Sequence, residues 1–207
     1  MIFKDRFEAG RLLASKLLEY KDSKDTVVIA LPRGGVPLGY VIAKELNLPF
    51  DIFFVKKIPS PYNKEVAIGA VSENGYIYKN DYAINMLNVS ESYLDSAIRE
   101  VLEKIKQKRE LYNIKPTDIK NKRVILVDDG IATGSSVYLA IEALKKMGAK
   151  EVIVATPVAP SDAINLIKSV ANRVVVLHTP ANFMAVGAYY EDFHQLGDNE
   201  VIELLNS

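Results

Sequence analysis

The fold is decided by the stretch Val124-Ile125-Leu126-Val127-Asp128-Asp129-Gly130-Ile131-Ala132-Thr133-Gly134-Ser135-Ser136. Its four apolar residues predict a buried strand. Two carboxylates follow that strand, and small, hydroxyl-rich residues then lead into a helical pattern. Ligands of open α/β sheets bind beyond the carboxyl ends of the strands, and helix N-termini bind anions. The stretch therefore predicts a site for a phosphorylated sugar, with carboxylates for hydroxyls or a metal and a loop for phosphate.

Length and composition predict one domain over residues 1–207. Apolar residues make up 49% of the chain, and 26 basic residues balance 26 acidic ones. Zero net charge gives no bulk signature of nucleic-acid binding, although residues 104–122 offer a local basic face. The absence of Cys excludes disulfides, thiolate metal sites and a Cys nucleophile. The charged N-terminus lacks the apolar run of a signal peptide, and no stretch approaches the ~20 apolar residues of a membrane span. We expect a cytoplasmic protein with no membrane or nucleic-acid partner.

Strand-like and helix-like patterns alternate along the chain, which favours a parallel α/β sheet. The expected strands are 26–31, 50–55, 124–127, 151–158 and 173–178. The expected helices are 7–18, 36–46, 90–112, 137–147, 161–170 and 199–205. A second turn, residues 31–35, also leads from a strand into a helix, so we expect it on the same edge of the sheet as Asp128 and Asp129.

Residues 58–78 interrupt this alternation. Several Pro, Gly and Asn residues surround a short apolar stretch, which predicts a flexible loop with a hairpin formed by 67–71 and 76–78. Long loops in compact domains are often functional lids, and a plain surface hairpin fits the sequence equally well. Lys64 and Glu65 lie in this segment, and the sequence assigns neither of them a role.

The central stretch resembles the phosphoribosyl-pyrophosphate motif of the type I phosphoribosyltransferases, which is an apolar strand, two acidic residues and a Thr-Gly loop. The resemblance extends over about residues 7–192. It is greatest to a bacterial and archaeal phosphoribosyltransferase-domain group, through Arg33-Gly34-Gly35-Val36-Pro37, Ala67-Ile68-Gly69-Ala70-Val71 and Tyr190-Glu191-Asp192-Phe193. It implies a Rossmann-like α/β fold, in which a five-stranded, mainly parallel sheet has helices on both faces. Residues 179–207 would form a small hood.

The resemblance also implies an activity. A phosphoribosyltransferase transfers the 5-phosphoribosyl group from phosphoribosyl pyrophosphate to a nitrogenous base or related acceptor and releases pyrophosphate. Asp128 and Asp129 would hold the ribose hydroxyls, directly or through Mg²⁺, which prefers oxygen ligands. Arg33 would bind phosphate oxygens, and Lys57, at the end of the second strand, would reach the pyrophosphate. A homodimer is the expected assembly.

The remaining residues of the implied site are mostly small. The 5′-phosphate loop would consist of Gly130, Ile131, Ala132, Thr133, Gly134, Ser135 and Ser136, and the pyrophosphate loop of Gly34 and Gly35 beside Arg33. Gly134 lets the backbone approach the ligand closely. The neighbouring Lys56 would face solvent.

The acceptor is less defined than the sugar site. Phe183 could stack on a planar base with Asp192 nearby, but a packed C-terminal cap explains these residues equally well. The 6-oxopurine branch of the family carries an acid where this chain has Ala132, which disfavours a 6-oxopurine acceptor. Glu65 and Asp192 remain open as a general base. Two alternatives to the transferase function remain open. One is a regulator that senses phosphoribosyl pyrophosphate or nucleotides, and the other is a hydrolase of phosphosugars or nucleotides.

Overall fold

The computed structural model describes residues 1–207 and is built around a five-stranded sheet. Every neighbouring pair of strands in the order β2-β1-β6-β7-β8 is parallel. The strands are β1 (Thr26–Ala30), β2 (Phe50–Ile52), β6 (Arg123–Val127), β7 (Glu151–Val158) and β8 (Arg173–His178). The predicted five-stranded parallel sheet is confirmed.

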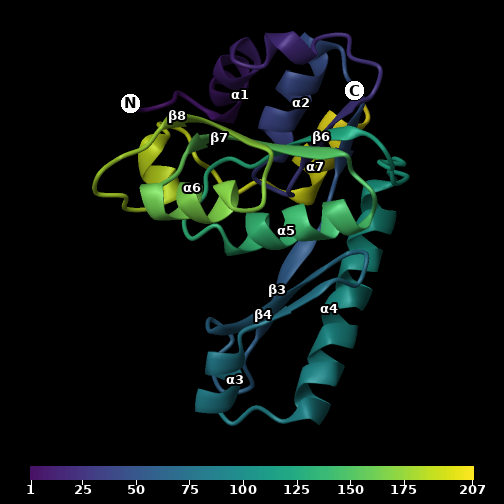
Figure 1. Ribbon diagram of the computed structural model, residues 1–207, viewed down its shortest axis with the longest axis vertical. Coiled ribbons are helices and arrows are strands. Elements are labelled where there is room, and N and C mark those ends of the chain that lie inside the picture. Colours follow the sequence, from purple (N-terminus) through teal and green to yellow (C-terminus); the bar gives the residue numbers. More distant parts are fainter.

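Helices cover both faces of this sheet (Figure 1). On one face lie α1 (Arg6–Ser15) and α2 (Val36–Leu46), and on the other lie α5 (Ser135–Lys146) and α6 (Ser161–Lys168). Successive side chains of a strand point to opposite faces. Accordingly, Val28 packs in the core beneath α1 and α2, whereas Val27 and Ile29 pack in the core beside α5 and α6.

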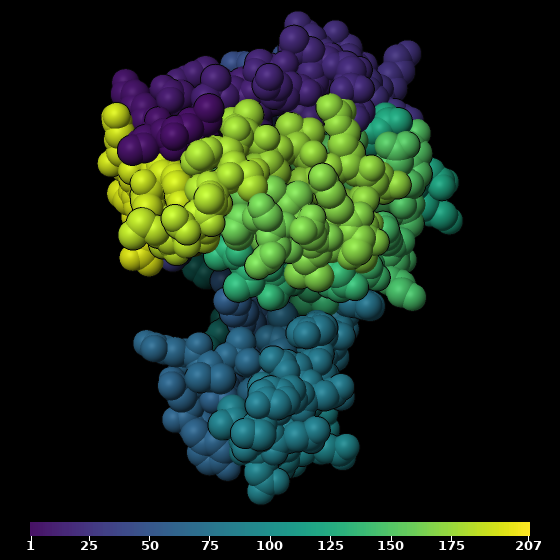
Figure 2. Space-filling model, turned by 60° about the vertical axis from the view of Figure 1, so that its left-hand side comes forward, coloured from purple at the N-terminus to yellow at the C-terminus, as the bar shows by residue number.

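The chain between β2 and β6 forms a lobe that projects from the body (Figures 1 and 2). It contains a second, antiparallel sheet of β3 (Val55–Pro59), β4 (Ala67–Ser72) and β5 (Ile77–Lys79). The short α3 (Asp81–Met86) and the long α4 (Glu91–Tyr112) complete it. The predicted hairpin is confirmed as β4 and β5, whereas the sequence patterns did not predict β3 or α3.

The prediction of a strand over 50–55 is wrong at its C-terminal bound, because β2 ends at Ile52. The parallel ladder with β1 stops at Ile52, and the chain then leaves the main sheet to pair with β4. Lys56 and Lys57 therefore lie within β3, opposite Val71 and Ala70, rather than at the end of the second strand. Short apolar runs do not reveal which partner a strand takes, so the sequence could not show this change of sheet.

Arg109 of α4 fixes the projecting lobe to the main sheet. Its Nη1 lies 2.9 Å from Asp51 Oδ1 of β2, and its Nη2 lies 2.8 Å from Glu73 Oε1, just after β4. Glu73 Oε1 also accepts a hydrogen bond from the Phe54 N–H at 3.0 Å. Since all three charged side chains are largely buried, this cluster sets the direction in which α4 leaves the body.

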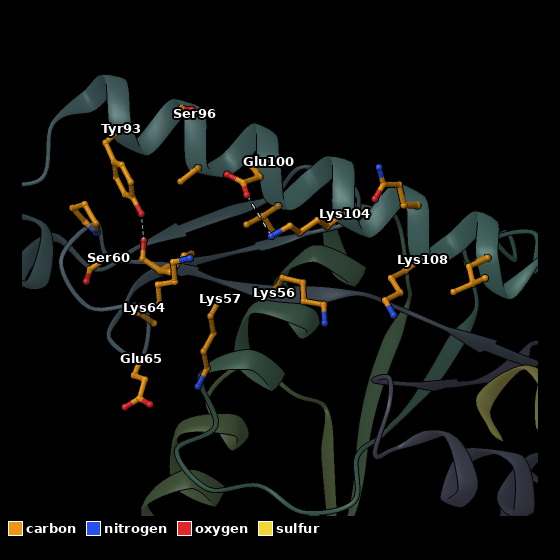
Figure 3. A pocket seen from close by; sticks show the side chains of 17 residues that line it. Lys56, Lys57, Ser60, Lys64, Glu65, Tyr93, Ser96, Glu100, Lys104 and Lys108 are labelled. Carbon is orange, nitrogen blue, oxygen red and sulfur yellow. Dashed lines mark hydrogen bonds and ion pairs between the residues drawn. The ribbon is translucent and has the colours of Figure 1, made fainter. Parts of the chain in front are cut away.

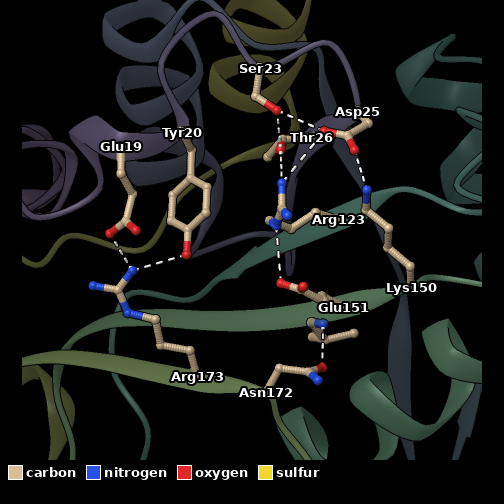
Figure 4. Close-up of polar contacts among 11 residues, drawn as sticks. Glu19, Tyr20, Ser23, Asp25, Thr26, Arg123, Lys150, Glu151, Asn172 and Arg173 are labelled. Atoms are coloured by element: carbon tan, nitrogen blue, oxygen red, sulfur yellow. Dashed lines mark hydrogen bonds and ion pairs between the residues drawn. The ribbon is translucent and has the colours of Figure 1, made fainter.

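A network of ion pairs joins the amino ends of the strands, opposite the edge that carries Asp128 (Figure 4). Arg123 Nε lies 3.0 Å from Glu151 Oε2, and its Nη1 lies 3.5 Å from Asp25 Oδ1. Asp25 also pairs with Lys150. The acidic and basic side chains neutralise one another at the amino edge of the sheet, where no candidate site residue lies.

The C-terminal part folds back across α2 and α4. It contains the one-turn helix η2 (Val186–Tyr189) and α7 (Asp198–Leu205), and a further short helix, η1 (Leu18–Tyr20), follows α1. Phe7 and Leu12, two apolar residues of α1, are exposed. No helix combines the length and apolar character needed to cross a bilayer.

Candidate functional site

Two loops meet at the carboxyl edge of the main sheet. One follows β1 and contains Arg33, Gly34 and Gly35; the other follows β6 and begins with Asp128 and Asp129. A Cβ on Gly34 would lie 2.2 Å from Asp129 Oδ2, and a Cβ on Gly35 would lie 2.6 Å from the carbonyl oxygen of Val127. Glycine is therefore required at both positions for the loops to touch. The Pro32–Arg33 peptide bond is cis.

Burial raises the pKa values of the two acidic side chains, Asp128 and Asp129. Asp128 Oδ1 accepts a hydrogen bond from the Asp129 N–H at 2.9 Å. Burial raises the pKa of Asp128 well above its usual range, and the charge of Asp129 raises it further. Burial also raises the pKa of Asp129, although the Arg6 guanidinium opposes that rise. Asp128 is thus the carboxylate that most needs a cation or a hydroxyl donor from a ligand.

Arg6 is a site residue that the sequence patterns did not identify. Its Nε lies 3.1 Å from Asp129 Oδ2, and its Nη1 donates to the His194 carbonyl oxygen at 2.9 Å. The guanidinium also lies 4.0 Å from the centre of the Phe193 ring. The hydroxyl of Tyr190, a residue noted only for its motif, donates to the Asp129 carbonyl oxygen at 2.5 Å. Arg6 and Tyr190 therefore tie α1 and the C-terminal segment to the acidic loop.

The segment 130–136 forms the turn into α5. Gly134 has a φ of 88°, and α5 begins at Ser135. Ala132, Thr133 and Ser135 are exposed, and the Thr133 and Ser135 hydroxyls lie 3.0 Å apart. Ile131 differs from these residues because its side chain is buried in the core, while its N–H donates to the Val158 carbonyl oxygen at 2.9 Å. The loop thus presents backbone and hydroxyl groups at a helix N-terminus, and Ile131 anchors it.

A groove of about 850 Å³ separates β3 from α4 (Figure 3). Its charged lining comprises Lys56, Lys57, Lys64, Glu65, Glu100, Lys104 and Lys108. Lys57 extends away from α4, whereas Lys56 reaches to the same side as Lys108. Partial burial lowers the pKa of Lys56, and the positive charges of Lys108 and Arg33 lower it further. The groove is therefore basic, and Arg33 lies near one end of it.

Asp198 brings the start of α7 to that end of the groove. Its carboxylate lies 3.8 Å from Arg33 Nη1 and 2.5 Å from Lys108 Nζ, and it accepts a hydrogen bond from the Tyr112 hydroxyl at 2.7 Å. These contacts hold the pKa of Asp198 below its usual range, chiefly through Lys108 and then Tyr112. Neither Lys108 nor Asp198 belongs to a recognisable motif, so no local pattern predicts this contact.

The C-terminal aromatic residues pack beside the acidic loop. A Cβ on Gly130 would lie 2.4 Å from Val186 Cγ1, which brings η2 directly against the turn after Asp129. Phe183 stacks on Tyr189 with ring centres 5.7 Å apart, and Tyr189 meets His178 edge-on. Asp192 accepts hydrogen bonds from His194. Phe183 thus belongs to an aromatic stack with Tyr189 near the acidic loop. The Asp192 carboxylate is exposed and hydrogen-bonded to His194.

Comparisons with known proteins agree with this arrangement. The family model "Phosphoribosyl transferase domain" matches residues 3–192. "Putative phosphoribosyl transferase Rv0571c" of Mycobacterium tuberculosis is 36% identical over 99% of the chain, which spans 46% of that relative's length. The crystal structure of TT1426 from Thermus thermophilus is 37% identical, with a TM-score of 0.82 over 99% of this chain and 98% of that one.

A more distant structure shares the fold. The purine phosphoribosyltransferase of Pyrococcus horikoshii is 22% identical, with a TM-score of 0.51 over 91% of this chain and 90% of that one. Since the family model covers most of the chain and two relatives above 30% identity match nearly all of it, the chain belongs to the phosphoribosyl transferase domain family.

Proposed function

We propose that this protein transfers the 5-phosphoribosyl group of phosphoribosyl pyrophosphate to a nitrogenous acceptor and releases pyrophosphate. The contact between Gly34 and the Asp129 carboxylate carries the proposal. It joins a glycine-rich turn with an arginine to a pair of carboxylates, at the edge of the sheet where α/β proteins bind ligands. A sugar that carries phosphates at two positions has complementary groups for both loops.

Each loop has a distinct role in this proposal. Backbone N–H groups and hydroxyls of 130–136, at the start of α5, hold the 5′-phosphate. Asp128 accepts the ribose hydroxyls, and Arg6 holds the Asp129 carboxylate in position beside them. Arg33 and Lys57 bind the pyrophosphate, because Arg33 is a partly exposed cation in the turn after β1 and Lys57 is an exposed cation that lines the neighbouring groove. Ile131 contributes by anchoring the loop, because its side chain is buried and its N–H already donates to the Val158 carbonyl oxygen.

Mg²⁺ fits the acidic pair with help from the ligand. No group of three or more metal-ligating side chains gathers in the chain, so protein atoms alone would not complete its coordination. Asp128 and Asp129 would hold the ion, with hydroxyl, pyrophosphate and water oxygens as the other ligands. When bound, Mg²⁺ neutralises charge on the departing pyrophosphate.

Catalysis would rest on position and charge. An oxocarbenium-like centre develops at the anomeric carbon as its bond to pyrophosphate breaks, and Arg33 and Lys57 stabilise the departing anion. The Asp128 and Asp129 carboxylates orient the ribose from the other side. No covalent enzyme intermediate is needed, so the site does not require a nucleophilic side chain.

The acceptor side offers an aromatic surface and no acid in the phosphate loop. Phe183 and Tyr189 supply a stacked pair for a planar ring, and Val186, in the same short helix η2 as Tyr189, lies against Gly130. With Ala132 in place of an acid, we propose an acceptor other than a 6-oxopurine.

We also propose a homodimer. The exposed side chains of Tyr62, Tyr82 and Met86 in the lobe would give a second copy of the chain an apolar surface to bind.

The activity can be tested by the release of pyrophosphate from phosphoribosyl pyrophosphate and Mg²⁺ in the presence of a panel of nitrogenous bases. We expect release that requires one class of base and is lost in Asp128→Asn. Base-independent release of ribose 5-phosphate and pyrophosphate would indicate a hydrolase instead. Tight binding of phosphoribosyl pyrophosphate without turnover of any base would indicate a sensor. The absence of an acid from 130–136 also favours that alternative.

A further inference from the structure

Three cations from three separate elements surround the carboxylate of Asp198. Arg33 belongs to the turn after β1, Lys56 to β3 and Lys108 to α4. Arg33 and Lys108 lie 3.8 and 2.5 Å from the carboxylate oxygens. Lys56 has no carboxylate within 4 Å, yet it lies close enough to Lys108 and Arg33 for their charges to lower its pKa. The cluster thus holds two more positive charges than negative ones.

These groups remain within reach of a ligand. The side chains of Arg33, Lys108 and Asp198 are 38%, 34% and 28% exposed. Lys56 and Lys108 line the groove between β3 and α4, and their ammonium groups lie on the same side of it (Figure 3). The arrangement is therefore an open pocket for negative charge that a single carboxylate of the same chain partly fills.

We propose that Arg33, Lys56 and Lys108 form a subsite for a diphosphate anion, and that the Asp198 carboxylate occupies it until the anion displaces it. This inference rests on the proposed function, because it assigns the pyrophosphate end of the same site. It adds Lys56, from β3, and Lys108, from α4, to the residues that bind this anion. It also makes the start of α7 an internal competitor of the ligand.

A diphosphate fits this cluster better than a carboxylate does. It brings two or more negative charges to three cations, and its several oxygens can accept from Arg33 and both ammonium groups at once. Asp198 can leave without unfolding α7, because that helix is also held by the buried side chain of Val201. Tyr112 would then lose its acceptor and could donate to a phosphate oxygen instead.

A purely structural role for Asp198 predicts different behaviour. Asp198 would then only join α7 to α4, its loss would lower the stability of the protein, and the affinity for anions would stay the same or fall. As an internal competitor, Asp198 must weaken anion binding, so that its neutralisation raises the affinity. The two interpretations therefore differ in the sign of the change in affinity.

The test is calorimetric titration of inorganic pyrophosphate, with Mg²⁺, into the full chain. Asp198→Asn keeps the size of the side chain and an acceptor for Tyr112, and we expect it to bind pyrophosphate about three- to fivefold more tightly. Lys108→Met should bind about tenfold more weakly, since it loses one charged donor. Glu203→Gln, on the exposed side of α7, is the matched control and should leave the affinity unchanged.

Unchanged or weaker binding in Asp198→Asn would overturn the proposal, as would no binding to the wild-type chain. Unchanged binding in Lys108→Met would do so even if Asp198→Asn failed to fold. A parallel titration of phosphoribosyl pyrophosphate into wild type and Asp128→Asn separates this inference from the proposed function. If Asp128 is needed there but Asp198→Asn has no effect on pyrophosphate, only the subsite fails.

Discussion

Arg6 and Asp129 lie 123 positions apart in the chain and form an ion pair, with Nε and Oδ2 3.1 Å apart. The two side chains are only 7% and 13% exposed. The first helix thus supplies the counter-ion for a carboxylate of the β6 loop. Burial raises the pKa of Asp129, and the Arg6 guanidinium opposes that rise.

Arg6→Met should lower the free energy of unfolding by about 3 kcal/mol, because it leaves Asp129 buried without its partner. Urea denaturation measures this difference. The double variant Arg6→Met with Asp129→Asn removes the unpaired charge and should recover part of the loss. If the double variant loses as much as the sum of the two single variants, the pair is not coupled.

Gly34→Ala should disturb the contact between the two loops. Its Cβ would lie 2.2 Å from Asp129 Oδ2, so either the carboxylate or the turn must move. Such overpacking typically costs about 1–3 kcal/mol. We expect a comparable loss in the binding free energy of phosphoribosyl pyrophosphate by calorimetry. Gly197→Ala, with open space around its Cβ position, serves as a control whose ligand affinity should match wild type.

Arg109→Met should detach the projecting lobe from the main sheet. The change leaves the largely buried Asp51 and Glu73 without their shared counter-ion. Removing one partner of a buried ion pair costs about 3–5 kcal/mol, which urea denaturation would measure. Hydrogen exchange should also show faster opening of β3 and β4 in this variant. Wild-type stability with wild-type exchange would mean that the cluster does not hold the lobe.

Asp25 should contribute to the acid sensitivity of the fold. Its contacts with Lys150 and Ser23 lower the pKa of its carboxyl to about 2 from an ordinary value of 3.8. Because the folded pKa is lower, the stabilisation is present above about pH 4 and is lost as the pH falls toward 2. The difference in Tm between wild type and Asp25→Asn should therefore shrink over this range. A difference that stays constant from pH 5 to pH 2 would contradict this assignment.

The main sheet was accessible to sequence analysis because its strands have strong local signals. The apolar runs of β6, β7 and β8 are flanked by helical patterns, and α2 has the predicted bounds Val36–Leu46. The same applies to α4, whose apolar stripe includes Leu94, Ile98 and Val101. Periodicity reveals such elements because each buries one face against a neighbour.

The lobe and much of the site geometry depend on long-range contacts that no local pattern reveals. Nothing in the sequence around Lys56 and Lys57 shows that β3 pairs with β4 rather than continuing the main sheet. Arg6 and Asp198 are single charged residues in helices at opposite ends of the chain. Their partners are determined by how those helices pack, so only the folded structure identifies them.

The most direct test of the central claim is calorimetric titration of phosphoribosyl pyrophosphate with Mg²⁺ into the wild-type chain and the Asp128→Asn variant. The account predicts saturable one-site binding to wild type and a loss of at least about tenfold in affinity in the variant, equal to about 1.4 kcal/mol. Both proteins should show the same unfolding midpoint in urea to within a small shift. Equal affinity in the two proteins, or no binding to wild type, would contradict the assignment of this site.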